Sequence, residues 1–348
     1  MWGRCYTVLQ LRKEVPVGFF DGLKRDSKQN QTIVGGRAPQ SQEQREAQAG
    51  ATYREPDPDE LEVSMREVAP ATYHSEPVQP LKSYKDKAPV KHVIGHTRVI
   101  GIINQKGGVG KSTTAINLAA ALGEMGKQVL LIDLDPQGNC SSGLGIEKGL
   151  IQQCIYDVLL NDAPLEDVII PDVAEGLDVA PATINLAGAE VELVSEMARE
   201  NRLKDAIGSM RGKYDFVIID CPPALGLLTV NAMVAADKLL IPIQCEFYAL
   251  EGVTKLLESM KRVKSRLNPS LDIYGILLTM YDSRTILSKQ VADEVREYFG
   301  RLVFSTPIPR TVKLSEAPSF GQPITQYDPR GRGSLSYIEL AKEVIARG

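Results

Sequence analysis

The chain has few histidines, and none of them lies in its main part. All three histidines, His74, His92 and His96, precede Arg98 in a chain of 348 residues. A Ser/His/Asp triad and a histidine-ligated metal centre both need imidazole nitrogens. The sequence therefore excludes both kinds of chemistry from the region that begins at Arg98.

Cysteine is also sparse, and its spacing shows no metal-binding pattern. The five cysteines, Cys5, Cys140, Cys154, Cys221 and Cys245, lie far apart and form no C-x-x-C pair. Zinc sites and disulfide frameworks usually show such close spacings. We therefore interpret the cysteines as small buried hydrophobic residues, which is how most free cysteines behave.

Long apolar runs and an excess of positive charge are missing too. No segment reaches the roughly 18 to 20 consecutive apolar residues that cross a membrane, and no signal-peptide pattern opens the chain. The formal net charge is −4, which argues against a protein that coats nucleic acid through its overall charge. We expect a cytoplasmic protein without a membrane partner, in which any DNA binding comes from a local basic patch.

The first 95 residues differ in composition from the rest of the chain. They are rich in Gln, Glu, Pro, Ser and Lys, as in the run 55–60, and offer too little apolar surface to offset chain entropy. We predict a disordered extension over residues 1–95, with short helices near 42–48 and 58–67. A winged-helix domain would need periodic apolar faces, which are absent. Translation that begins at Met65 or later is an alternative that the sequence leaves open.

From residue 98 to residue 348 the pattern becomes strand, turn and helix, repeated. The apolar share of 43% and the charged share of 24% are ordinary for a globular protein. This alternation predicts one α/β domain with a doubly wound, mostly parallel sheet that is covered by helices on both faces. The expected strands are 99–104, 128–133, 214–220, 238–243 and 273–279, and the expected helices are 111–125, 184–210, 225–236, 247–266, 286–299 and 334–346.

A glycine-rich loop, Lys106-Gly-Gly-Val-Gly-Lys-Ser112, follows the first expected strand and opens the first expected helix. The standard P-loop is G-x-x-x-x-G-K-[ST], in which backbone N–H groups cradle phosphates, Lys reaches the β/γ oxygens and the hydroxyl binds Mg²⁺. Gly110, Lys111 and Ser112 fit the end of this pattern, whereas Gln105 replaces its first glycine.

The loop still suits an anion, because glycines let the backbone approach it and the helix directs its positive end toward it. The sequence therefore predicts a P-loop ATPase with ATP and Mg²⁺ as cofactors. The residues that we expect to bind the nucleotide here are Lys106, Gly107, Gly108, Val109, Gly110, Lys111, Ser112 and Thr113.

Three carboxylates follow expected strands. Asp133 and Asp135 come at the end of the second strand, where alternation puts them on the same side. Asp220 ends the apolar run 216–220, where a Walker B aspartate would hold Mg²⁺ through water. We predict that Ser112, Asp133 and Asp220 form the metal site, and we interpret Cys221 as a packed thiol.

The loop resembles the deviant Walker A sequence, K-G-G-x-G-K-[ST], of the ParA/MinD superfamily of ATPases, and the resemblance extends from about residue 98 to the C-terminus. It implies that Lys106 reaches across a homodimer interface to the nucleotide of the partner subunit, so that ATP binding and dimerisation are one event. It also implies that Asp135 orients the attacking water. Lys106, Lys111 and Asp135 are therefore the predicted catalytic residues, with slow turnover until a partner stimulates it.

Segments 282–285, 308–319 and 327–333 resemble the chromosomal ParA branch of this superfamily, also called Soj. The resemblance implies that Pro309 and Thr311 contact the adenine, although the family more often has Asn at the second position.

The same resemblance implies that Arg284 and Lys313 bind DNA. Lys313 is commonly Arg in the family, but a lysine still contacts phosphate. Further basic residues would complete a face for nonspecific double-stranded DNA, which dimerisation would duplicate. The whole expected set is Arg284, Lys289, Arg296, Arg310, Lys313, Arg330 and Arg332.

Four functions are compatible with these motifs. The first is a nucleoid-associated ATPase that partitions a chromosome or plasmid with a ParB-like partner. The second is a MinD-like regulator at the membrane, but the ending 340–348 has mixed charge and resembles a packing helix rather than a basic interfacial one. The third is an iron–sulfur carrier, for which the spacing of Cys140 and Cys154 is unsuitable. The fourth is an ATPase that positions another cargo at a cell pole.

Overall fold

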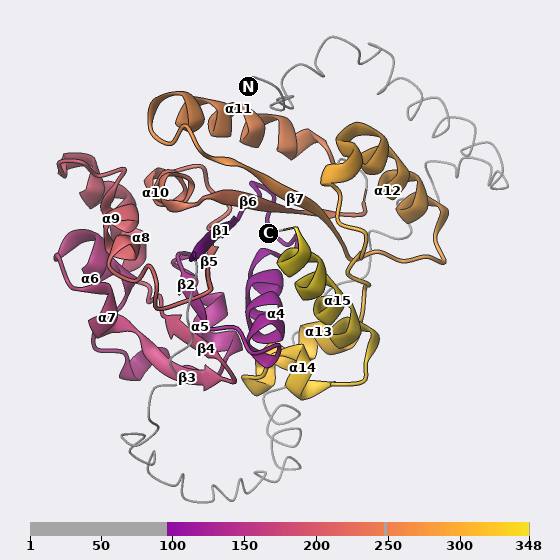
Figure 1. Ribbon diagram of the computed structural model, residues 1–348, viewed down its shortest axis with the longest axis horizontal. Helices are drawn as coiled ribbons and strands as arrows, with labels where there is room; N and C mark the ends of the chain where they lie inside the picture. The colour runs from indigo at the N-terminus through magenta and orange to yellow at the C-terminus, as the bar shows by residue number, and fades with distance from the viewer. Residues whose placement is uncertain (1–95, 247–248, 348) are drawn as a thin grey trace, which may run out of the picture. The chain divides into compact units, whose positions relative to one another are not determined.

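A seven-stranded sheet forms the centre of the computed structural model, which describes residues 96–246 and 249–347 (Figure 1). The strand order is β3-β4-β2-β5-β1-β6-β7. All neighbouring strands are parallel except β3 and β4. The strands are β1 (Arg98–Ile102), β2 (Val129–Asp133), β3 (Ile170–Ala174), β4 (Leu177–Ala180), β5 (Phe216–Asp220), β6 (Lys238–Gln244) and β7 (Asp272–Thr279).

Helices connect the strands and confirm the predicted doubly wound α/β architecture. The α-helices are α4 (Lys111–Glu124), α5 (Asn139–Gly143), α6 (Ile155–Leu160), α7 (Leu165–Val168), α8 (Leu186–Glu192), α9 (Arg202–Gly208), α10 (Leu227–Ala235), α11 (Glu251–Arg266), α12 (Ile286–Phe299), α13 (Val312–Glu316), α14 (Ile324–Tyr327) and α15 (Arg332–Ala346). Short 3₁₀ helices are η2 (Lys148–Leu150), η3 (Leu193–Ser195), η4 (Gly300–Leu302) and η5 (Ala317–Phe320). The predicted disorder over 1–95 and the helices expected there lie outside the described residues.

The two faces of the sheet bury different helices because strand side chains alternate. On one face, Leu131 and Ile218 pack in a core cluster with Leu118 of α4 and Leu340 of α15. Figure 1 shows α4 and α15 side by side over this face. Leu130, the neighbour of Leu131, is equally buried and points to the other face, where α10 packs on β1.

The last helix is a packing element, as the sequence predicts. Leu340, Ala341 and Val344 of α15 have no exposed surface. The hydroxyl groups of Tyr337 and Thr114 lie 3.4 Å apart, which links α15 to α4. No helix in the described part of the chain is long and apolar enough to cross a bilayer.

Two parts of the predicted pattern are wrong. The single helix expected over 184–210 is divided into α8, η3 and α9, because the chain turns at 196–201, where Ala198 has a φ of 51°. The sequence analysis also missed β3 and β4. Both are short, and β3 has mostly half-exposed or exposed residues, so neither shows the apolar run by which the other strands were found.

The packing of α15 can be tested by truncating one buried side chain. Leu340→Ala should lower the free energy of unfolding by about 2–5 kcal/mol, because it leaves a cavity between α4, α15 and the sheet. Glu339→Ala, which removes only an exposed ion pair with Lys342, should change it by less than about 1 kcal/mol. Urea denaturation measures both. A Leu340→Ala protein as stable as the wild type would contradict the docked position of this helix.

Candidate functional site

The glycine-rich loop joins β1 to α4 and is open toward the surface. Gly108 and Gly110 have φ angles of 74° and 88°, which side chains with a Cβ rarely adopt. A Cβ added at Gly107 or Gly108 would meet no atom within 4 Å. No side chain caps the N-terminus of α4. Its first backbone N–H groups are therefore available to an anion that approaches over the glycines.

Polar contacts within the loop fix its two lysines. The backbone N–H of Lys106 donates to Oδ1 of Asn104 (3.0 Å), and Nδ2 of Asn104 donates to the carbonyl of Pro242 in β6 (2.7 Å). Nζ of Lys111, which is only 7% exposed, donates to the carbonyl oxygen of Lys106 (3.4 Å). The loop is thus closed around a buried ammonium group, with Ser112 and Thr113 half-buried in the next turn.

Thr279, at the end of β7, holds the loop from the other side. Its hydroxyl donates to the carbonyl of Val109 at 2.8 Å. The next residue, Met280, has a φ of 51°, so the chain turns sharply just after this contact. The sequence analysis did not identify Thr279, because the two residues are 170 positions apart.

The segment with the predicted adenine contacts runs beside the same end of β7. Tyr281 forms a parallel bridge with Pro309, and the N–H of Arg310 donates to the carbonyl of Tyr281 (3.1 Å). Pro309 is buried, whereas Thr311 is half-buried and caps α13 by accepting from the N–H of Leu314 (3.2 Å). The adenine contact itself stays a prediction, but β7 brings this segment and the P-loop to the same edge of the sheet.

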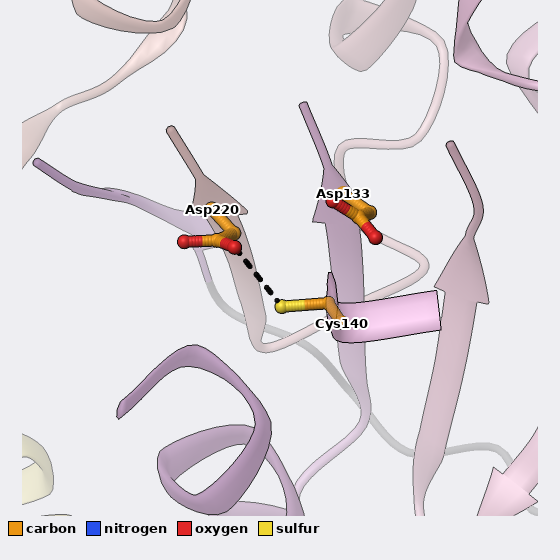
Figure 2. Close-up of side chains that lie close together, drawn as sticks. All are labelled: Asp133, Cys140 and Asp220. Carbon is orange, nitrogen blue, oxygen red and sulfur yellow. Dashed lines mark hydrogen bonds between the residues drawn. The ribbon is translucent and has the colours of Figure 1, made fainter. Parts of the chain in front are cut away.

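Two of the predicted metal ligands lie opposite each other. Asp133 ends β2, Asp220 ends β5, and the strand register pairs them directly. Both side chains are fully buried (Figure 2). Oδ2 of Asp133 accepts from the N–H (2.8 Å) and the hydroxyl (2.7 Å) of Ser141. Oδ1 of Asp220, in contrast, has no hydrogen-bond partner in the described part of the chain.

Both carboxylates have a raised pKa, chiefly because they are buried. Burial raises the pKa of Asp220 well above the ordinary aspartate range, and the charge of Asp133 adds to the effect. The pKa of Asp133 is also raised by burial, against the lowering effect of the Ser141 hydrogen bonds. A pair of buried carboxylates with an unpartnered oxygen fits a hard divalent cation such as Mg²⁺, which prefers oxygen ligands.

Asp135 follows this pair in the turn after β2. It is 6% exposed, and its Oδ1 accepts from the N–H of Gln137 at 3.0 Å. Its own N–H lies 3.4 Å from Oδ1 of Asp133. The predicted water-orienting carboxylate therefore lies next to Asp133, held by its own turn.

The thiol of Cys140, predicted to be a buried packing group, lies beside Asp220 and the P-loop residue Ser112. Cys140, on α5, directs its Sγ toward Oδ2 of Asp220 at 3.2 Å (Figure 2). The same Sγ lies 3.7 Å from the carbonyl of Ser112. Burial, followed by the charge of Asp220, raises the pKa of this thiol strongly. Cys154, Cys221 and Cys245 are likewise buried and free, as predicted, while Cys5 lies outside the described residues.

The two predicted DNA-binding residues are exposed and already paired. Arg284 is 87% exposed and donates to Asp282 through Nε (2.9 Å) and Nη2 (2.7 Å). Nζ of Lys313 lies 2.9 Å from Glu316. Arg332, at the start of α15, lies close enough to Asp282 to help lower the pKa of that carboxyl. Arg284 and Arg332 both lie near Asp282, although the two arginines are 48 positions apart in the sequence.

Comparisons with known proteins identify the family. The chain is 57% identical over 251 residues to the sporulation initiation inhibitor protein Soj of Bacillus subtilis, covering 72% of this chain and 99% of Soj. It is 54% identical to the chromosome partitioning protein ParA of Caulobacter vibrioides, covering 72% and 94%. This chain belongs to the Soj/ParA family of chromosome-partitioning ATPases. A family profile described as an AAA domain matches residues 97–273.

Solved structures support the fold and the ligand class of this Soj/ParA chain. A cobyrinic acid a,c-diamide synthase from Mycobacterium smegmatis with bound ADP and magnesium has a TM-score of 0.64 and 39% identity. The match covers 72% of this chain and 94% of the synthase. The ligands of that protein agree with the adenine nucleotide and Mg²⁺ that the P-loop sequence predicts.

The contact between Thr279 and the P-loop yields a prediction for nucleotide affinity. Thr279→Val should weaken ATP binding about fivefold or more, because the Val109 carbonyl loses its donor and the loop its lateral support. Thr279→Ser, which keeps the hydroxyl, should stay close to the wild type. Titration calorimetry measures both. Equal affinities for all three proteins would mean that the hydrogen bond has no part in shaping the loop.

Proposed function

We propose that this protein is an ATP-driven switch for partitioning chromosomal DNA. ATP joins two copies of the chain, the dimer binds double-stranded DNA nonspecifically, and a ParB-like partner stimulates hydrolysis and release. The observation that carries this proposal is the combination of a P-loop that begins with Lys106 and relatives of more than 50% identity that are named for chromosome partitioning.

The nucleotide site has the parts that phosphoryl transfer to water needs. Lys111 and the amides at the start of α4 neutralise and orient the phosphates. Ser112, Asp133 and Asp220 would hold Mg²⁺, which when bound supplies charge neutralisation between the phosphate oxygens. Asp135 accepts a hydrogen bond from the attacking water and directs it. Phosphoryl transfer to water needs no covalent nucleophile from the chain, so catalysis rests on position and charge.

Dimerisation depends on Lys106. This residue is half-buried at the start of the loop, and the next two residues, Gly107 and Gly108, are exposed. A second subunit can therefore approach the phosphates closely at this point, because no side chains stand in between. Lys106 then contributes positive charge to the nucleotide of the partner subunit, so that the dimer forms only with ATP bound.

DNA binding is assigned to the basic surface around the starts of α12 and α15. Arg284 and Arg332 are both exposed and lie near Asp282, and Lys313 is exposed on α13. Backbone contacts by such residues carry no sequence information, which suits a protein that binds anywhere on the nucleoid. One patch on each subunit doubles the number of neutralised phosphates in the ATP dimer.

A membrane-bound mode of action has less support. The last helix, which would have to lie on a bilayer in a MinD-like regulator, buries Tyr337, Leu340, Ala341 and Val344 against α4 and the sheet. An ATPase that positions another cargo uses the same nucleotide switch, and binding to a ParB-like partner separates it from the proposed function.

The cross-interface role of Lys106 can be tested in a variant that does not hydrolyse ATP, so that hydrolysis does not dissociate the dimer. In an Asp135→Ala background, the protein with ATP should elute as a dimer in size-exclusion chromatography. Adding Lys106→Ala should restore the monomer while ATP affinity stays within about threefold. Lys111→Ala, in contrast, should abolish ATP binding itself, because it removes the buried ammonium group at the phosphates. A Lys106→Ala protein that still dimerised would contradict the proposal.

The DNA surface can be tested by reversing one charge. Arg284→Glu should weaken ATP-dependent DNA binding about tenfold or more and make its salt dependence less steep. The matched control is Lys204→Glu, an exposed lysine on α9, which packs against α6 and α10. Gel shifts at several salt concentrations measure both. If Arg284→Glu bound DNA like the wild type, the assigned surface would be wrong.

A further inference from the structure

The group formed by Asp133, Cys140 and Asp220 has the composition of a metal centre that is not purely oxygen-based. One ligand atom from each residue lies within 4.8 Å of the other two, and all three residues are buried. Figure 2 shows the thiol of Cys140 between the two carboxylates that end β2 and β5. A thiol is not needed for Mg²⁺, which is held by oxygen atoms.

The distances suit one shared ion. Sγ of Cys140 is 3.2 Å from Oδ2 of Asp220. Two ligands on a tetrahedral zinc ion, at about 2.3 Å for sulfur and about 2.0 Å for oxygen, lie about 3.5 Å apart. The observed spacing therefore needs a shift of only a few tenths of an ångström to accommodate an ion between the two atoms.

Each carboxylate has an oxygen atom, Oδ1, that can still bind such an ion. Asp220 is fully buried, yet its Oδ1 has no hydrogen-bond partner within the described ranges. Among the described residues, Oδ1 of Asp133 accepts one long contact, 3.4 Å from the backbone nitrogen of Asp135. Two negative charges without a positive partner in a buried site are costly, and a divalent ion removes that cost.

We propose that Asp133, Cys140 and Asp220 bind a thiophilic divalent ion, such as Zn²⁺ or Cd²⁺, in the nucleotide-free protein. The ion displaces the proton of the Cys140 thiol, which passes to solvent, and forms one bond to sulfur and at least one to each carboxylate. Thiolate ligands select such ions over Mg²⁺. The thiol is a weak hydrogen-bond donor in the Mg²⁺ form and becomes a ligand in the thiophilic form.

This site shares its carboxylates with the Mg²⁺ site, so a bound thiophilic ion excludes Mg²⁺ and stops hydrolysis. That consequence rests on the proposed ATPase function, whereas binding of the ion does not. The two can therefore be tested apart, by measuring ion binding without nucleotide and hydrolysis in a second experiment.

Cd²⁺ is the probe for the first experiment, because its bonds to thiolates absorb in the ultraviolet. The full chain without nucleotide is titrated with Cd²⁺ in excess Mg²⁺, and bound Cd²⁺ is counted by equilibrium dialysis. Cys140→Ala should bind one Cd²⁺ fewer, or bind it at least about tenfold more weakly, and should lose part of the thiolate absorption. Cys140→Ser tests whether an oxygen of similar size replaces the sulfur, and it should behave like Cys140→Ala.

Cys221→Ala is the matched control, because Cys221 is also a buried thiol beside Asp220 but directs its Sγ to the carbonyl of Ile219. It should bind Cd²⁺ like the wild type. Thermal melting of each variant checks that the fold is kept. Equal Cd²⁺ binding by the wild type and Cys140→Ala would overturn the proposal, and so would a loss confined to Cys221→Ala.

The second experiment measures Mg²⁺-dependent ATP hydrolysis at increasing Cd²⁺. The wild type should be inhibited at the concentrations that fill the Cys140 site, and Cys140→Ala should require at least about tenfold more. Binding at Cys140 without inhibition would uphold the ion site and contradict the assignment of Asp133 and Asp220 to Mg²⁺. Failure of the proposed ion site and failure of the proposed ATPase assignment therefore give different results.

Discussion

Two aspartates that face each other without a positive charge between them impose the main constraint on this structure. Parallel pairing of β2 and β5 puts Asp133 directly opposite Asp220, and both are fully buried. Such a pair is stable only if hydrogen bonds, a proton or a cation compensate for its charge. Ser141 does so on one side, with two hydrogen bonds to Asp133. On the side of Asp220 the P-loop approaches through Ser112, whose carbonyl oxygen lies 3.7 Å from the Cys140 thiol that contacts Asp220.

The C-terminal third of the chain is part of the same arrangement. Thr279 supports the P-loop through Val109, and the turn after it leads to the bridge between Tyr281 and Pro309. From there the chain continues through α13 and α14 into α15, which packs on α4, the helix that begins with Lys111. The nucleotide loop is therefore supported on one side by the same stretch of chain that carries the basic surface.

The sequence predicted the parts of the site that are local in the chain. The P-loop and the ends of β2 and β5 are each recognisable within ten residues, because a strand, a turn and a functional residue follow one another directly. Contacts between distant segments were missed. Thr279 is 170 positions from Val109, and Cys140 is 80 positions from Asp220, so no spacing rule connects them. In the fold, β3 and β4 at the sheet edge were missed because partly exposed edge strands lack the continuous apolar pattern of buried parallel strands.

The ion pairs on the basic surface give the proposed DNA contact a particular character. Arg284 is held by Asp282, Lys313 by Glu316 and Arg310 by Glu246. A DNA phosphate must therefore replace a carboxylate at each basic residue. The net gain in binding free energy per residue is small, because one exposed ion pair is lost for each one formed. DNA binding at these residues therefore exchanges one ion pair, with a carboxylate, for another, with a phosphate. We therefore expect a single subunit to hold DNA only briefly, and the proposed ATP-bound dimer, which makes twice as many contacts, to hold it longer.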